Sequence, residues 1–271
     1  MIDYLYDKLL ERQPTRIILI LGSGRSGTNW LGYTLGAHPD VRVTIENQKI
    51  LKWSVDLALW PEKRYQLLQK LISRYKKEYI LSFSKHYLDK SHPNIWSAPE
   101  LASALPNARF IGIQRNPYAS VSSMLRHPTQ PGVLVWHERW KEFPIPNAFL
   151  GIDQEMAEEY DSFSLTKQCA IRWQAHKERM DRLRQLMGSR LLVIDYDRFF
   201  LQNELHLEQL RQFIGLNSPI PSPTIRHGSL NRWKKLLTPE QCHEIATVVG
   251  FGPEEVDSEK HTPPILRARA G

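Results

Sequence analysis

Residues 15–30 read TRIILILGSGRSGTNW, an apolar run followed by a glycine-rich turn. The run over residues 16–21 predicts a buried strand, and a helix is expected to begin near Ser26. Three glycines let the backbone fold tightly, so that successive N–H groups can converge on an anion. The start of the helix adds unpaired N–H donors and the positive end of its dipole. The stretch therefore predicts a strand–loop–helix unit that binds a phosphate-like group.

The loop matches only part of the P-loop of nucleoside triphosphate-binding proteins. The spacing from Gly22 to Gly27 agrees with that motif, which continues with a lysine and then a serine or threonine. Here Thr28 and Asn29 stand at those two positions, and the basic residue, Arg25, lies inside the loop. A P-loop nucleotide kinase with a strand-end aspartate as magnesium ligand stays open as an alternative, although the motif lysine is missing.

A second anion site is predicted where another strand ends. Residues 108–113 read ARFIGI, a short apolar run that predicts a buried strand. Arg115 follows at its carboxyl end, where open α/β sheets bind their ligands, and a helix is expected to begin at Pro117. Ser123 stands eight residues after Arg115, on that helix. Arg115 is therefore expected at the ligand-binding edge of the sheet, next to the helix that carries Ser123.

These two motifs together resemble the donor site of sulfotransferases that use 3′-phosphoadenosine 5′-phosphosulfate (PAPS). Residues 22–30 are similar to the 5′-phosphosulfate loop of that family, in the arginine form of carbohydrate, bacterial and tyrosylprotein members. Asn29 departs from the usual second threonine. Arg115 and Ser123 have the spacing of the family's 3′-phosphate site. The resemblance implies PAPS as the sulfuryl donor and its desulfonated form, PAP, as a product.

Two later segments extend the resemblance over nearly the whole chain. Residues 191–197 read LLVIDYD, predict a strand, and resemble the family segment whose tyrosine lies near the adenine; Tyr196 takes that position. Residues 226–235 read RHGSLNRWKK and resemble the basic loop that closes over the 3′-phosphate. The cofactor-binding residues that the resemblance implies are Gly24, Arg25, Ser26, Gly27, Thr28, Asn29, Trp30, Arg115, Ser123, Tyr196, Arg226, His227 and Gly228.

The resemblance also implies cationic groups that act on the leaving phosphate. Arg25 fits the leaving 5′-phosphate, and Lys90, 25 residues before Arg115, matches the catalytic lysine of the tyrosylprotein enzymes. By analogy with phosphoryl transfer, the protein's tasks are alignment and stabilisation of developing charge. No motif in the sequence requires a metal.

The acceptor hydroxyl needs a base, and the sequence offers two. Glu46 lies 21 residues after Arg25, the spacing of the proposed base in tyrosylprotein sulfotransferases. His92 ends a Lys-Ser-His run that resembles the Lys-Thr-His of the cytosolic enzymes, in which the histidine is the base. Histidine titrates near neutral pH, whereas a glutamate would need burial to raise its pKa. Glu46 is slightly favoured because its neighbourhood follows the arginine-type branch, and His86 is the next choice if neither acts.

Composition sets outer limits on partners and location. Thirty-six basic against 29 acidic residues give a net charge of +7, which suits a polyanionic ligand. PAPS is such a ligand, so no nucleic acid is expected. The sequence has no 18-residue apolar run and its charged N-terminus is unlike a signal peptide, so we expect no membrane span and a cytoplasmic location. Two cysteines make no disulfide framework.

The order of predicted elements indicates one domain over residues 1–271 with a P-loop-like three-layer α/β/α fold around a central parallel sheet. Alternating strands and helices are typical of such a sheet. Strands are expected at residues 16–21, 41–45, 86–90, 109–114 and 191–197, and helices at residues 62–76 and 99–105, among others. Apolar residues at helical spacing over 165–187 place Cys169 and His176 in the core rather than in catalysis.

An aromatic and proline-rich insertion over residues 127–163 has no clear secondary structure, and we interpret it as a lid or acceptor-pocket wall. Its aromatic side chains suit a sugar, a phenol, a lipid or a small metabolite that carries a hydroxyl or an amine. The acceptor and the oligomeric state are therefore left open. A catalytically silent PAP-binding module is the non-enzymatic alternative.

Overall fold

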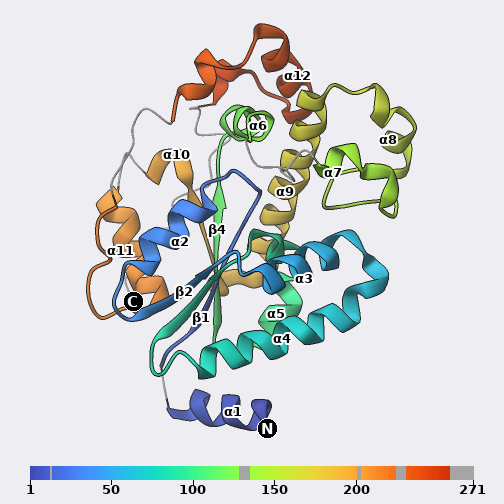
Figure 1. Ribbon diagram of the computed structural model, residues 1–271. Helices are drawn as coiled ribbons and strands as arrows, with labels where there is room; N and C mark the ends of the chain where they lie inside the picture. The colour runs from blue at the N-terminus through green and yellow to red at the C-terminus, as the bar shows by residue number, and fades with distance from the viewer. Residues whose placement is uncertain (13, 128–134, 200–202, 224–229, 257–271) are drawn as a thin grey trace.

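The fold is built on five parallel strands that carry the order β2-β3-β1-β4-β5 (Figure 1). The computed structural model describes residues 1–12, 14–127, 135–199, 203–223 and 230–256. Strand β1 lies at the centre of the sheet, hydrogen-bonded in parallel to β3 on one side and β4 on the other. The strands are β1 (Ile17–Gly22), β2 (Val41–Ile45), β3 (His86–Lys90), β4 (Ala108–Gln114) and β5 (Leu191–Asp195).

Helices cover both faces of the sheet, and the alternation of side chains along β1 explains why. Ile17, Leu19 and Leu21 point to one face and Ile18 and Ile20 to the other, and all five are fully buried. The first face carries α1 (Ile2–Arg12), α3 (Gln48–Leu59), α4 (Arg64–Ile80), α5 (Ala98–Ala104) and the C-terminal half of α9 (Leu165–Met187). The second carries α2 (Thr28–Gly36), α10 (Tyr196–Phe199) and α11 (Asn203–Ile214). The predicted three-layer α/β/α fold is confirmed.

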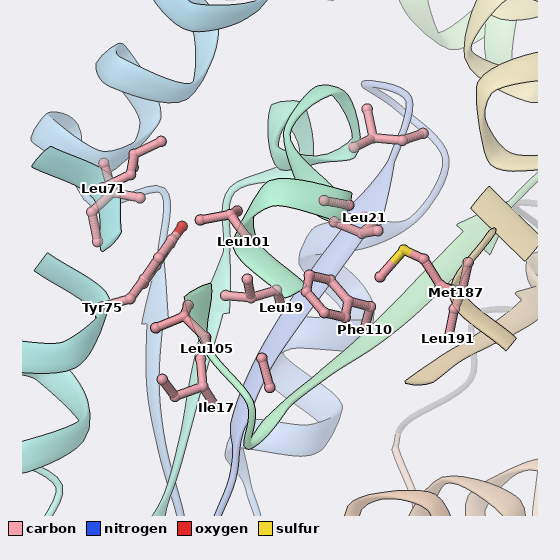
Figure 2. Packing of buried hydrophobic residues seen from close by; sticks show 14 of the residues in the cluster. Ile17, Leu19, Leu21, Leu71, Tyr75, Leu101, Leu105, Phe110, Met187 and Leu191 are labelled. Atoms are coloured by element: carbon pink, nitrogen blue, oxygen red, sulfur yellow. The ribbon is translucent and has the colours of Figure 1, made fainter. Parts of the chain in front are cut away.

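The first of these faces holds the larger apolar core (Figure 2). Leu19 and Phe110 of neighbouring strands lie between Leu101 of α5 and Met187 of α9. Burying each such side chain contributes about 1.5–3 kcal/mol. The core therefore fixes the strands firmly, so that whatever follows their carboxyl ends is held in place.

Several element boundaries differ from the sequence-based expectations. Helix α3 was not anticipated, although Asn47 caps it by accepting from the N–H of Ile50. The helix predicted at 62–76 is α4, which extends to Ile80. The helix expected near Ser26 begins at Thr28. Helix α5 agrees with the short helix expected at residues 99–105.

Two more expectations are corrected in the second half of the chain. The strand predicted over 191–197 ends at Asp195, because the Asp195 carboxylate accepts from the N–H groups of Asp197 and Arg198 and so starts α10. The 127–163 region does contain short helices among its described residues, α7 (Val135–Glu138) and α8 (Gln154–Glu159).

Two elements lie beyond the carboxyl ends of the strands: α6 (Pro117–Leu125), which follows β4, and α12 (Pro239–Val249), which packs with α6 and α9 (Figure 1). Cys169 and His176 are buried in α9, as the periodicity predicted. In the described ranges, no helix combines the length and apolarity that crossing a bilayer requires.

Buried histidines make the fold sensitive to acid. Burial is the main cause that lowers the pKa of His86 to about 4 and the pKa values of His137 and His176 to about 3. The unfolded chain binds these protons near pH 6.5, so stability is present above that pH and is lost as pH falls. Asp89 and Asp197, whose pKa values burial raises to about 6, act in the opposite direction. His92 and His206 also have lowered pKa values and Asp195 a raised one, so that five such histidines stand against three carboxyls among the described residues, and stability should fall as pH falls from 6 to 4.

Urea unfolding measured from pH 7 to 4.5 checks this prediction. The free energy of unfolding should fall steadily below pH 6.5. In His137→Gln, the number of protons that unfolding takes up, given by the slope of the free energy of unfolding against pH, should be smaller by about one. The matched control, His243→Gln, changes an exposed histidine of α12 and should leave the slope unchanged. A free energy that stays constant or rises on acidification contradicts the expectation.

Candidate active site

All five strands end at the same edge of the sheet, and each delivers a predicted site residue there. Glu46 follows β2, Lys90 ends β3, the glycine loop follows β1, Arg115 follows β4 and Tyr196 follows β5. Because the strand order is β2-β3-β1-β4-β5, the loop lies between the Glu46–Lys90 side and the Arg115–Tyr196 side. The carboxyl edge of a parallel sheet is the usual ligand site of open α/β folds.

The glycine loop has the conformation of an anion cradle. Arg25 and Gly27 adopt left-handed conformations, with φ of 73° and 96°. A Cβ at Gly27 would lie 2.2 Å from Cδ2 of Tyr196, so only glycine fits against that ring. Ser26 is buried, and its hydroxyl donates to the Ser23 carbonyl at 2.8 Å. The Ser26 side chain therefore braces the loop rather than facing the cavity.

The loop opens onto a cavity of about 480 Å³. Most of the predicted donor-site and catalytic residues with described positions line it: Gly24, Arg25, Gly27, Thr28, Asn29, Glu46, Lys90, His92, Arg115, Ser123 and Tyr196. Trp30 is not among them, because its ring packs edge-on against Tyr196 and Phe199. Arg226, His227 and Gly228 lie outside the described residues.

At one end of the cavity, Arg25 contacts Ser123, and Arg115 lies near enough for its charge to act on Arg25. The Nε of Arg25 donates to the Ser123 hydroxyl at 3.1 Å. The Arg115 guanidinium lies 4.8 Å above the Tyr196 ring, and its Nε is 3.8 Å from an Asp197 oxygen. Burial, followed by the charge of Arg115, lowers the pKa of Arg25. Two cations held this close together suit a ligand with more than one negative charge.

Asp197 orients this end of the site. Its Oδ2 accepts from the backbone N–H and the side-chain amide of Asn116, at 2.8 and 3.0 Å. Asn116 in turn caps α6 by accepting from the N–H of Ala119. The Asp197 carboxylate therefore holds Asn116, the residue that follows Arg115. It also contacts the Arg115 guanidinium and so helps to orient it.

At the other end, Glu46, Lys90 and His92 form a compact group. The Lys90 ammonium donates to Glu46 Oε1, and His92 Nδ1 lies 4.0 Å from the same oxygen. Glu46 has φ of 51°, which non-glycine residues seldom adopt, and its N–H donates to the Lys90 carbonyl at 3.0 Å. Burial lowers the pKa of Lys90, and it lowers the pKa of His92 to well below its ordinary value.

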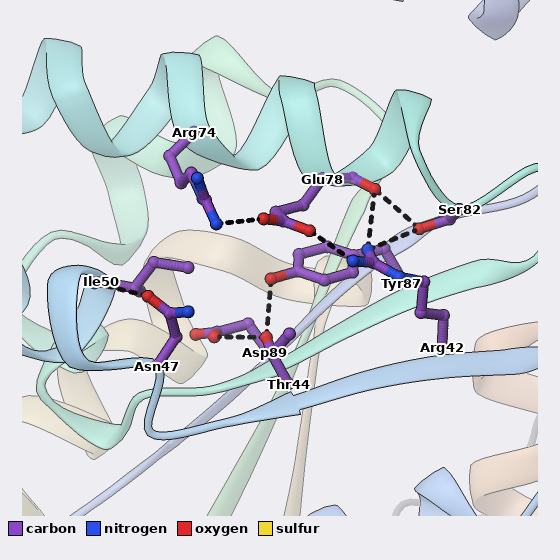
Figure 3. A network of polar contacts seen from close by, with 9 residues as sticks. All are labelled: Arg42, Thr44, Asn47, Ile50, Arg74, Glu78, Ser82, Tyr87 and Asp89. Atoms are coloured by element: carbon purple, nitrogen blue, oxygen red, sulfur yellow. Dashed lines mark hydrogen bonds and ion pairs between the residues drawn. The ribbon is translucent and has the colours of Figure 1, made fainter.

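A polar network behind β2 and β3 holds this group in place (Figure 3). Asp89 is fully buried and accepts hydrogen bonds from Thr44 of β2 and Tyr75 of α4, both at 3.0 Å. The Thr44 hydroxyl also bonds the Tyr87 hydroxyl at 2.7 Å. The network thus ties together the strand positions just before Glu46 and Lys90. Burial raises the pKa of Asp89 to about 6 despite these donors.

The sequence did not identify part of the cavity wall. Leu51 and Val55 of α3 line the cavity and were not anticipated, whereas His127 and Trp136, which also line it, belong to the region interpreted as a lid or acceptor-pocket wall. The apolar spacing after Asn47 was the signal that could have revealed α3. His86, the third choice for the base, lies at the amino end of β3, and its Nδ1 accepts from the Arg16 N–H. It is therefore at the opposite edge of the sheet from the cavity.

Comparison with known families settles the class of protein. Residues 17–219, well over half of the chain and including every strand, match the profile of the sulfotransferase family. The chain belongs to the sulfotransferase family. A comparison with curated proteins gave no match. Within the described ranges, no group of three or more His, Cys, Asp or Glu side chains is arranged to hold a metal ion.

Solved structures share the fold at low sequence identity. The sulfotransferase domain of the Synechococcus PCC 7002 olefin synthase aligns with a TM-score of 0.50 and 17% identity, over 89% of this chain and 96% of that one. The sulfotransferase domain of the curacin biosynthetic pathway gives 0.51 and 14%, over 89% and 99%. Mouse sulfotransferase SULT7A1, solved in complex with PAP, gives 0.50 and 16%, over 87% and 83%. The sulfotransferase fold is thus shared along most of the chain.

Proposed function

We propose that this protein transfers the sulfuryl group of PAPS to a hydroxyl group of an acceptor. One observation carries the proposal: the glycine loop, the Arg115–Ser123 pair and the Glu46–Lys90 pair all line a single cavity. Its volume of about 480 Å³ falls in the range of ligand pockets. The mouse protein was solved with PAP, the desulfonated form of PAPS, and PAPS is proposed as the donor here.

The anion-binding groups of the cavity can be divided between the donor's two charged ends. The loop N–H groups, Arg25 and Thr28 would hold the 5′-phosphosulfate, because a glycine loop at a helix start binds such anions. Arg115 and Ser123 would hold the 3′-phosphate. Tyr196, which lies under Arg115, would contact the adenine side. The close packing of the loop against Tyr196 supports this fit: the Tyr196 ring leaves no room for a side chain at position 27.

Glu46 is the better candidate for the general base. Its carboxylate lines the cavity and its side chain is 37% exposed, so an acceptor hydroxyl can reach it. His92 also lines the cavity but is only 8% exposed, and its strongly lowered pKa makes it a weak base. In the proposed step the Glu46 carboxylate takes the hydroxyl proton. The acceptor oxygen bonds to sulfur, and the bond from sulfur to the 5′-phosphate oxygen breaks.

Lys90 and Arg25 would stabilise the phosphate that leaves with the electron pair. Lys90 is 2% exposed and borders the cavity, and its ammonium is already paired with Glu46. A cation fixed in a site of low dielectric stabilises developing negative charge with little reorganisation. The Glu46–Lys90 pair therefore places the proposed base next to a cation. The proposed base would take the hydroxyl proton, and the cation would stabilise the leaving phosphate.

The 127–163 region would form the acceptor side of one domain that spans residues 1–271. His127 and Trp136 support this proposal because both line the cavity. The direct test is to incubate the protein with PAPS and a panel of hydroxyl and amine acceptors and to measure PAP release by chromatography. Acceptor-dependent PAP formation supports the proposal. Tight PAP binding without transfer to any acceptor would indicate a catalytically silent module.

A further inference from the structure

Arg172 of α9 is a buried cation that no hydrogen bond satisfies. The residue is 0% exposed, and none of its three guanidinium nitrogens has a hydrogen-bond partner among the described residues. Its guanidinium carbon lies 4.6 Å from the centroid of the Trp136 ring and 4.4 Å from that of the Phe149 ring, and these two rings pack edge to face against each other with centroids 5.1 Å apart. Buried arginines are normally paired with an anion, because an unpaired charge in the interior is costly.

Among the described residues, no negatively charged group acts on the pKa of Arg172. The groups that shift its pKa, besides burial itself, are the Cys169 thiol and the Tyr160 phenol, and both are neutral at pH 7. Burial lowers the pKa of Arg172 to about 10, so the guanidinium remains charged. The positive charge in turn helps to lower the pKa values of His137 and His176.

The neighbouring polar groups are already engaged with one another. His137 Nδ1 bonds the Tyr160 hydroxyl at 2.8 Å, and its Nε2 lies 3.9 Å from the Cys169 sulfur. His176 Nδ1 donates to the Arg172 carbonyl at 2.8 Å, which leaves Nε2 to accept from the Trp96 indole at 3.4 Å. The ring faces offset part of the cost of the buried charge. The hydrogen-bonding capacity of the guanidinium stays unused.

Arg172 does not line the cavity of the proposed active site, but it contacts Trp136, which does. Trp136, whose ring covers the guanidinium, lines the cavity together with Glu46 and Lys90. His92 also lines the cavity, and the charge of Arg172 contributes to its lowered pKa. A ligand in the cavity would therefore reach the guanidinium once the Trp136 side chain turned aside.

We propose that Arg172 binds an oxyanion, a carboxylate or a phosphate, carried by the acceptor, and that Trp136 covers this subsite until the acceptor enters. This inference rests on the proposed sulfuryl transfer and narrows its acceptor to an anionic hydroxyl compound. Guanidinium groups bind carboxylate and phosphate through paired N–H···O bonds, which suits a subsite with three unused nitrogens. Neutral sugars and simple phenols would leave the charge unpaired.

The experiment compares the wild type with Arg172→Met by differential scanning calorimetry of the PAP-saturated protein. PAP fills the donor anion sites, so added inorganic phosphate reports on other sites. In chloride, Arg172→Met should have the higher Tm, because an apolar side chain of similar size replaces an unpaired buried charge. Phosphate at ten times its half-saturating concentration should raise the wild-type Tm by about 3 °C over chloride of equal ionic strength, and should not raise that of the variant.

Two further variants sharpen the test. Arg182→Met removes an arginine from the same helix whose side chain is 69% exposed, and it should keep the phosphate response. Trp136→Ala should lower the half-saturating phosphate concentration about tenfold, because the ring no longer covers the guanidinium. A lower Tm for Arg172→Met in chloride, a phosphate response that persists in it, or an unchanged response in Trp136→Ala would each overturn the inference.

The test of the Arg172 subsite can fail or succeed independently of the test of sulfuryl transfer. Titration of both proteins with PAP comes first and shows whether the donor site binds its ligand. Equal PAP affinity in the wild type and Arg172→Met also shows that the variant is folded. The difference in phosphate response between these two proteins is then measured whether or not any acceptor is turned over. Failure of PAP binding would count against the donor proposal alone.

Discussion

Glu46→Gln is expected to reduce kcat by about 10²–10⁴-fold, the usual contribution of a general base. Glutamine keeps the size and the hydrogen-bonding reach of the side chain, but its amide cannot take the acceptor proton. The affinity for PAP should stay within about twofold, because the phosphate-binding groups are at the loop and at Arg115. Steady-state PAP release and calorimetric titration with PAP measure the two quantities separately.

The matched comparison is His92→Asn, which changes the other candidate base. His92 is the more buried of the two, and burial lowers its pKa to well below its ordinary value, so this variant should keep most of its turnover. Loss of turnover in His92→Asn with full activity in Glu46→Gln would reverse the assignment. Full turnover in both variants would place the base elsewhere in the cavity.

Arg115→Ala is expected to weaken PAP binding by about 10²–10³-fold. Each charge-assisted hydrogen bond to a phosphate contributes about 1.5–3 kcal/mol, and an arginine can make two. The variant would also leave the Asp197 carboxylate, now 3.8 Å from Arg115 Nε, without its cation. The uncovered negative charge would repel the incoming phosphate and add to the loss.

Arg109→Ala is the control for this change. Arg109 lies on the same strand but pairs in register with Ile18, away from the carboxyl edge, and it does not line the cavity. Isothermal titration with PAP should therefore distinguish the two variants clearly. An equal loss of affinity in both would indicate a general effect of positive charge, and not a phosphate contact by Arg115.

The loop and the strand ends could be predicted because their signals are local. Three glycines and an apolar run define the β1–loop–α2 unit within 16 residues, and a parallel sheet brings every strand end to one edge. Arg115 and Glu46 therefore reach the same cavity although they are distant in sequence. The N-cap at Asn47 is also a local signal, yet helix α3 was not predicted. A short amphipathic helix is easily missed when the neighbouring segments have stronger patterns.

The surroundings of Arg172 could not be predicted, because they depend on packing between distant segments. In the sequence Arg172 interrupts the apolar face of α9 and resembles a solvated position. Trp136 and Phe149 come from a region without regular periodicity, and only the folded chain brings both rings against the guanidinium. Ser26 shows the same limit, since its hydroxyl turns to the Ser23 carbonyl instead of the ligand side.

The most direct test of the central claim is calorimetric titration of the purified protein with PAP and, separately, with Mg-ATP. The account predicts saturable PAP binding and weak binding of Mg-ATP, because the loop has Arg25 in place of the P-loop lysine and Thr28 and Asn29 where that motif continues. Tight Mg-ATP binding with no response to PAP would contradict the account and favour a nucleotide kinase.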